Sequence, residues 1–410
     1  MRVYVGPSIT RVHSQWAINF TAREGGVPQH SLIRLDQQGV IMSQTARRVV
    51  AVLFAFAGAL AVERLHAADA AHAATSAYFL DIIGGVDSST FDVGSDTEHI
   101  SLSLDGEHLV FKKDSYQQIA DGISVWSGRN VQKKAATYLY VANNGDDSSI
   151  KLVKGDFEYD VIKDSNGYYE LRVTDLTNTV AEEFLTDSDH KVDSAASQTL
   201  GTDSLTTSAL APPLEINVNL AYTKAALAHF PSATALKNEF VIGLARTNET
   251  LKNSNLNVRV RLNRFVFVKE YTENATLSLV REDVEAGLVP GLPVPINKNK
   301  TVLVVDVYGK WNGTAMLSGP YAVLKYHVIS SLTLAHELGH TFGAIHLKTY
   351  QFLNGRYTVM TQDRTLREPI YSNPKVQWLG EPAGTSTRFN AKRMCDEFFK
   401  LGTGCWITPQ

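Results

Sequence analysis

The chain has 410 residues, 44% of them hydrophobic and 20% charged, which predicts a largely globular protein with two or three domains. It has no run of the roughly 20 apolar residues that a membrane-spanning helix needs, so we expect no stable membrane insertion. The net charge of −3 is unevenly distributed: residues 75–211 hold 10 Lys and Arg against 23 Asp and Glu, and residues 212–410 hold 22 against 15. These opposite charges favour attraction between two units, although two separately solvated domains would give the same counts. No basic-aromatic pattern indicates nucleic-acid binding.

The first 74 residues are not expected to belong to the folded protein. We interpret residues 1–41 as a non-structural upstream segment. Residues 42–74 have the features of a signal peptide, with two arginines, an apolar run at 49–62 and small residues after it. We therefore expect a secreted, extracellular or periplasmic protein. The alternative is a surface-anchored adhesion protein that retains the apolar run as a membrane anchor.

Residues 75–185 are predicted to form an acidic, β-rich domain. Two segments, 138–142 and 168–173, are rich in aromatic and β-branched residues, and turn-forming residues lie next to them. The segment Lys154 to Phe157 is interpreted as a plain turn. Residues 186–213 have the Ser, Thr, Asp and Ala content of a linker and end in two prolines, which makes them a natural site for an activating proteolytic cut.

The pattern changes in residues 214–410, which we predict to be an α/β (α+β) catalytic domain with a mixed twisted sheet and about three helices. Alternating apolar residues predict strands near 216–220 and 258–262, and the apolar run 301–307 predicts a central strand. The predicted helices are Ser232 to Lys252, Val328 to Thr341, and Asn390 to Leu401, the last ended by Gly402.

One segment carries the chemistry: His-Glu-Leu-Gly-His-Thr-Phe-Gly-Ala-Ile-His, from His336 to His346. Residues four apart share one face of a helix, so His336 and His340 are predicted to bind one metal ion. Gly343 tolerates the backbone conformation that ends a helix, and the turn would return His346 as the third ligand. Three neutral imidazoles with one open tetrahedral position are typical of catalytic Zn²⁺.

Glu337 is the predicted general base. It follows His336 directly and would reach a water molecule bound to the zinc, whose pKa the metal lowers toward roughly 7. The reaction predicted is hydrolysis of a peptide bond in a protein or peptide substrate. The alternative is a catalytically inactive zinc-binding or peptide-binding module, against which the presence of Glu337 argues.

At these residues the sequence resembles the metzincin zinc metalloproteases. The resemblance implies that Met360 is the methionine of the turn beneath the zinc site, as in that family. Within the metzincins, Tyr371-Ser372-Asn373-Pro374 and Asn390-Ala391 are similar to the bacterial reprolysin-like (adamalysin-related) peptidases, with the peptidyl-Asp metalloendopeptidase group the nearest. In that family the residues from Gln362 to Pro374 wall the substrate pocket, so Tyr371, Ser372, Asn373 and Pro374 are the predicted pocket residues.

The sequence departs from parts of that pattern. Leu347 follows the third histidine where animal and snake-venom reprolysins have aspartate, and Gln362 stands where astacins and serralysins would supply a tyrosine. No cysteine occurs before Cys395, which excludes a cysteine-switch propeptide. The two cysteines, Cys395 and Cys405, lie too far from the histidines to be expected as zinc ligands, and in an exported protein a disulfide is favoured over two free thiols.

The resemblance also implies how substrate and propeptide bind. The substrate would add as a strand to the edge of the sheet, for which Thr314 to Ser318 is the candidate, with ordinary loops as the alternative. We expect a monomeric zymogen in which the domain at 75–185 is an intramolecular inhibitor, released by cutting in 186–213.

Overall fold

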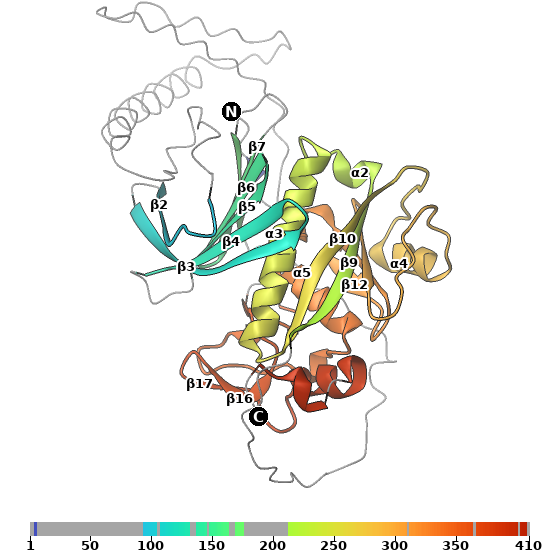
Figure 1. Cartoon of the computed structure of the whole chain (residues 1–410). Helices are drawn as coiled ribbons and strands as arrows, with labels where there is room; N and C mark the ends of the chain where they lie inside the picture. The colour runs from blue at the N-terminus through green and yellow to red at the C-terminus, as the bar shows by residue number, and fades with distance from the viewer. Residues whose placement is uncertain are drawn as a thin grey trace, which may run out of the picture.

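The computed structural model describes residues 4–5, 93–104, 107–131, 137–145, 147–163, 169–175, 212–309, 311–363, 366–400 and 402–407. The expected signal peptide and the linker up to residue 211 lie outside the described residues. Figure 1 shows a β-sheet unit, a mixed unit of helices and strands beside it, and a C-terminal part built mainly of loops and short elements. Among the described residues, no helix is long and apolar enough to cross a membrane.

The N-terminal unit is one eight-stranded sheet, as the strand-rich sequence predicts. Its order is β1-β8-β7-β6-β5-β4-β3-β2, antiparallel throughout except for β1, which pairs in parallel with β8. The strands are β1 (Tyr4–Val5), β2 (His99–Leu104), β3 (Glu107–Ala120), β4 (Ile123–Asn130), β5 (Thr137–Asn144), β6 (Asp147–Lys154), β7 (Phe157–Lys163) and β8 (Tyr169–Asp175). β1 therefore lies within residues 1–41, the upstream segment for which the sequence predicts no structure.

Tight turns join neighbouring strands of this sheet. Lys154 pairs with Phe157 across a two-residue connection whose Gly155 has a φ of +60°. Such hairpin turns need positive φ, which glycine adopts without strain. The segment Lys154 to Phe157 is therefore the plain turn that the sequence predicts.

The second unit is built on a five-stranded sheet in the order β10-β9-β11-β13-β12. Four strands are parallel, and the edge strand β12 runs antiparallel to β13. The strands are β9 (Leu214–Thr223), β10 (Val258–Val268), β11 (Lys300–Val305), β12 (Gly313–Ala315) and β13 (Tyr321–Lys325). The three strands that the sequence predicts are present, and β12 overlaps the predicted edge segment.

Helices cover both faces of this sheet. α3 (Ala233–Asn253) and α5 (Leu332–Thr341) pack on one face, and α4 (Leu277–Glu285) packs on the other. The Ser232 hydroxyl caps α3 by accepting from the Ala235 N–H at 3.0 Å. Shorter elements precede α3 and α5: α2 (Lys224–Leu227) and the 3₁₀ turn η4 (Tyr326–Val328).

Two helix predictions need correction. α4 was missed, although Leu277, Val280 and Val284 have helical spacing and are its buried residues. The predicted helix from Val328 is interrupted, because Ser331 adopts extended backbone and caps α5 through its hydroxyl.

Helix α3 lies between the two sheets. Of its 21 residues, 16 are buried, far more than one packed face requires. The core that contains its Phe240 and Leu244 also contains Ile123 and Tyr140 of the N-terminal sheet. The two units therefore share one continuous hydrophobic core through this helix.

The C-terminal part consists of short elements: η5 (His346–Lys348), β14 (Tyr357–Thr358), β15 (Arg367–Glu368), β16 (Asn373–Trp378), β17 (Glu381–Ala383), α6 (Asn390–Arg393), η7 (Met394–Phe399) and η8 (Gly402–Cys405). The predicted last helix continues beyond α6 as the π-helix η7. It ends at Lys400, which adopts a left-handed φ of 50°, and not at Gly402. A disulfide joins Cys395 and Cys405, so the chain must turn back early.

Candidate metal centre

Helix α5 places two histidines on one face. His336 and His340 are one turn apart, and their side chains are almost completely buried. Each is oriented from behind by a backbone carbonyl, because Nδ1 of His336 lies 2.9 Å from the Val359 oxygen and Nδ1 of His340 lies 2.9 Å from the Ala344 oxygen. Their Nε2 atoms are therefore held pointing away from these carbonyls.

Gly343 ends the helix and returns the chain toward these histidines. Its φ is +91°, and its N–H donates to the His340 carbonyl at 2.8 Å. A residue with a side chain would be strained in this conformation. The chain then enters η5, whose first residue is His346, so the role predicted for Gly343 agrees with its geometry.

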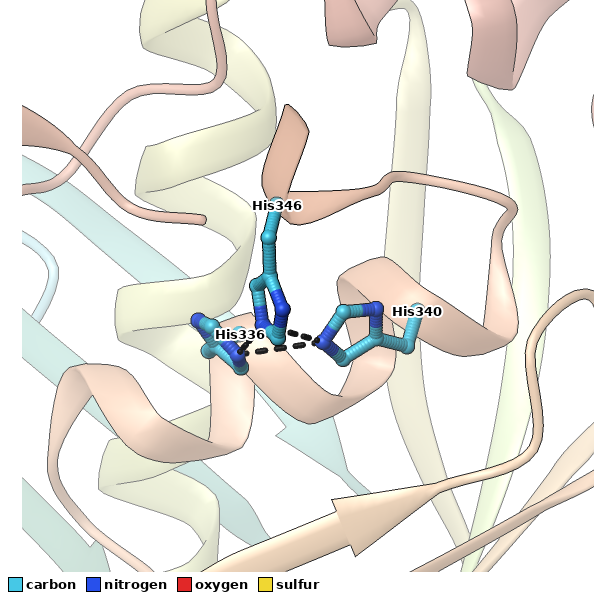
Figure 2. Close-up of side chains that lie close together, drawn as sticks. All are labelled: His336, His340 and His346. Atoms are coloured by element: carbon cyan, nitrogen blue, oxygen red, sulfur yellow. Dashed lines mark hydrogen bonds between the residues drawn. The ribbon is translucent and has the colours of Figure 1, made fainter. Parts of the chain in front are cut away.

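The three imidazole rings converge at their Nε2 atoms (Figure 2). The atoms are 3.1 Å apart for His336 and His340, and 3.0 Å apart for each of the other two pairs. Three nitrogens bound to one tetrahedral zinc at about 2.0–2.1 Å would lie about 3.3–3.4 Å apart. Among the described residues this is the group of histidine, cysteine and acidic side chains placed to hold a metal ion.

The convergence of three ring nitrogens explains why a cation fits there. When Nδ1 of His340 donates to the Ala344 carbonyl, the proton of this neutral ring is on Nδ1 and the lone pair is on Nε2. Nδ1 of His336 lies near both the Val359 carbonyl, an acceptor, and the Arg367 guanidinium, a donor. A metal ion at the centre of the three rings would accept one nitrogen lone pair from each neutral ring. The donor set of neutral imidazoles matches the preference of zinc.

The electrostatic environment keeps the ligands neutral. Burial lowers the pKa of His336 and His340 well below the ordinary value of 6.5, and the positive charge of Arg367 lowers both further. Burial, with a contribution from Arg367, lowers the pKa of His346 to about 4. Metal binding requires deprotonated ligands, so these groups need not lose a proton near neutral pH.

Glu337 is fully buried beside the edge strand of the sheet. A Cβ atom at Gly313, the first residue of β12, would lie 2.6 Å from Oε1 of Glu337. Only glycine therefore allows the backbone of β12 to approach this carboxylate so closely. The candidate base and the candidate substrate-binding strand are in direct contact.

Met360 lies beneath the helix that carries the two histidines. Its side chain is fully buried, and a Cβ atom at Gly339 would lie 2.7 Å from its Sδ atom and 2.8 Å from the ring of Tyr371. The glycine between the two histidines thus lets both side chains pack against the helix. The supporting role of Met360 at the zinc site stays a prediction.

Three of the four predicted pocket residues lie in the interior. Tyr371, Ser372 and Asn373 are fully buried, and each makes a hydrogen bond inside the protein. The Tyr371 hydroxyl donates to the Ala335 carbonyl at 2.6 Å, and the Asn373 amide donates to the Ser254 carbonyl at 3.0 Å. Pro374 is half-buried. The assignment of these four residues to a substrate pocket stays a prediction.

Two residues of the site were missed by the sequence reasoning. Arg367 is buried, its Nη2 lies 2.7 Å from Nδ1 of His336, and it donates to the Thr361 carbonyl at 2.8 Å. Nothing in its local sequence marks it, since an arginine in a loop is ordinarily solvated. Gly313 precedes the predicted edge segment, and a glycine beside a strand is a weak signal of close backbone approach.

No protein-family model and no curated protein matches this chain. A solved structure described as a chaperone-substrate complex is similar, with a TM-score of 0.39 and 14% identity over 62% of this chain, which spans 40% of that chain. Metalloproteinase-II from Bacteroides fragilis matches with a TM-score of 0.44 and 15% identity over 74% of this chain and 92% of that one.

A third similar structure is mature mirolysin from Tannerella forsythia, in complex with a cleaved peptide. It has a TM-score of 0.26 and 14% identity over 33% of this chain and 66% of that one. At these TM-scores we base the functional proposal on the geometry of the site.

Proposed function

We propose that this chain is a zinc-dependent metalloendopeptidase of the metzincin type. The observation that carries the proposal is the convergence of three Nε2 atoms, 3.0–3.1 Å apart, with a buried glutamate beside the first of the three histidines. A structural cluster of histidines needs neither the glutamate nor the convergence of all three Nε2 atoms. Its subgroup would be the bacterial reprolysin-like peptidases, and specifically the peptidyl-Asp metalloendopeptidase group.

The histidines and Glu337 would have separate roles in hydrolysis. His336, His340 and His346 would hold the zinc, which when bound supplies a water of lowered pKa and polarises the scissile carbonyl. Glu337 takes a proton from the attacking water and delivers it to the leaving amine nitrogen.

The edge strand β12 would bind the substrate. An extended peptide pairs with a sheet edge through main-chain hydrogen bonds, and β12 (Gly313–Ala315) ends the sheet next to Glu337. A peptide aligned along β12 would therefore pass the candidate base. Residues from Gln362 to Pro374 would then wall the pocket that determines specificity.

Export and latency complete the proposal. The segment 42–74 would direct secretion, and the disulfide between Cys395 and Cys405 suits an oxidising compartment. The β-rich domain would be a propeptide that inhibits the monomeric enzyme until the linker is cut. Its contacts with α3 support such an attachment: Arg246 pairs with Glu158 at 2.8 Å, and the Tyr140 hydroxyl donates to Glu249 at 2.7 Å.

The test is cleavage of a mixed peptide library by the full chain, before and after limited proteolysis of the linker, with bound metal measured. Glu337→Gln is expected to lower the cleavage rate by about 10²–10⁴-fold while zinc stays bound. Glu282→Gln, an exposed change on α4, is the matched control and should cleave as wild type does.

Two results would overturn the proposal. A wild-type chain that binds zinc but cleaves nothing after proteolysis would indicate the alternative function, an inactive zinc- or peptide-binding module. A wild-type chain that binds no zinc would refute the proposed metal centre itself.

A further inference from the structure

The third candidate ligand is held differently from the other two. His336 and His340 are fixed by the hydrogen bonds of α5, whereas His346 follows the end of that helix and is only half-buried. Its position therefore depends on what holds the backbone of the loop from Gly343 to Thr349. A ligand on a loop that moves would bind the metal ion less tightly.

The start of α6 holds this loop. The Asn390 side chain is completely buried and bonds to both backbone groups of Ile345, the residue before His346. Its Oδ1 accepts from the Ile345 N–H at 2.9 Å, and its Nδ2 donates to the Ile345 carbonyl at 3.1 Å. Ile345 is extended, with φ −131° and ψ 152°. Its N–H and C=O bond to one amide side chain, as those of a residue in a sheet would bond to a neighbouring strand.

The backbone after His346 is also attached to the start of α6. The Ser372 hydroxyl donates to the Lys348 carbonyl at 2.6 Å and accepts from the Asn390 N–H at 2.9 Å. Arg393 donates to the Gly343 carbonyl at 2.6 Å. The loop is thus fastened before and after His346, and Asn390 takes part in both attachments.

We propose that Asn390 is a positioning residue for the third metal ligand, and that it sets the metal affinity of the site through the backbone of Ile345. The inference rests on the metal centre of the proposed function. Asparagine is suited to this task because it offers a donor and an acceptor in one plane, which matches the N–H and C=O of an extended residue. Removal of a residue that orients a metal ligand in this way commonly weakens metal binding by about 10–100-fold.

Asn248 of α3 provides a matched control. It is also buried, and it also bonds to both backbone groups of one residue: Nδ2 donates to the Val260 carbonyl at 3.0 Å, and Oδ1 accepts from the Val260 N–H at 2.7 Å. Val260 lies in β10 and not in the loop that carries His346. Asn248→Ala should therefore destabilise the fold to a similar degree without loosening the third ligand.

The experiment is a zinc titration of the full chain against a chromophoric chelator, with thermal unfolding of the metal-free proteins measured in parallel. Asn390→Ala is expected to weaken zinc binding by about 10–100-fold, and Asn248→Ala by less than about 3-fold. The cobalt-substituted Asn390→Ala protein should also show an altered visible absorption spectrum, because the ligand geometry changes. His346→Ala sets the limit expected for loss of the ligand itself.

Asn390→Asp keeps the proposal testable if the alanine variant does not fold. Aspartate is isosteric and still accepts from the Ile345 N–H, but it cannot donate to the Ile345 carbonyl, so an intermediate loss of zinc affinity is expected. Unchanged affinity in both Asn390 variants, or an equal loss in Asn248→Ala, would overturn the assignment. A wild type that binds zinc but cleaves no peptide would refute the proposed function alone, because these affinities would still decide the role of Asn390.

Discussion

Glu239 lies at the centre of the contact between the N-terminal sheet and α3, and its replacement by glutamine should change how stability depends on pH. Burial raises the pKa of Glu239 from 4.5 to about 7, and the negative charge of Asp160 adds to the increase. Lys151, a hydrogen bond with Ser330 and Arg172 oppose it. The carboxyl group is therefore protonated in the folded protein up to about neutral pH.

The direction and size of the effect follow from this shift. Between pH 4.5 and 7 the folded state holds a proton that the unfolded state has released, so the free energy of unfolding falls as pH rises. The fall from this one group amounts to about 3 kcal/mol, at 1.36 kcal/mol per pKa unit. It is complete above about pH 7, where the charge must be buried.

Glu239→Gln removes the titration but keeps an oxygen for Ser330. Denaturant unfolding of the full chain at pH 5, 6, 7 and 8 should show little difference between variant and wild type at pH 5, and a variant more stable by about 3 kcal/mol at pH 8. The exposed variant Glu282→Gln should follow the wild type at every pH. A stability difference between Glu239→Gln and wild type that does not change with pH would refute this reasoning.

Three further substitutions probe the catalytic unit. Gly313→Ala places a Cβ atom against Glu337, so kcat should fall by about 10²-fold while the zinc titration stays unchanged; an unaltered kcat would contradict the contact. Gly339→Ala crowds Met360 beneath the zinc helix and should lower the free energy of unfolding by about 1–3 kcal/mol, measured by urea unfolding with Gly404→Ala as control. Burial lowers the pKa of Lys300 to about 7, so above that pH the unfolded state binds more protons than the folded state. The free energy of unfolding should therefore rise by roughly 3 kcal/mol from pH 7 to 10. Lys300→Met should abolish this rise.

The sequence predicts the parts of the site that depend on local geometry. His336 and His340 follow from helical spacing, and the turn at Gly343 follows from the conformational freedom of glycine. The strands near 216–220 and 301–307 follow from alternating or continuous apolar residues. Each of these signals lies within a short segment, which is why the sequence alone reveals it.

The remainder depends on contacts between distant segments. Tyr371 was assigned to a pocket by position in the chain, but its ring packs under a helix 30 residues away because Gly339 leaves space there. Arg367 and Asn390 act through backbone groups of other loops, and no spacing rule encodes such partners. The left-handed residue at Lys400 likewise follows from the return of the chain to the disulfide.

Because α3 is buried between the two sheets, a substitution in one unit affects which residues are tolerated in the other. A helix at a protein surface can vary freely along its outer face, but here Arg246 faces Glu158 and Glu249 faces Tyr140 of a separate sheet. A substitution at any of these positions leaves a buried partner unpaired, at a cost of about 1–3 kcal/mol or more for a charged group. Substitutions in α3 are therefore expected to be accompanied by compensating substitutions in β5 and β7. In related chains the two units would then change together in sequence, and not independently.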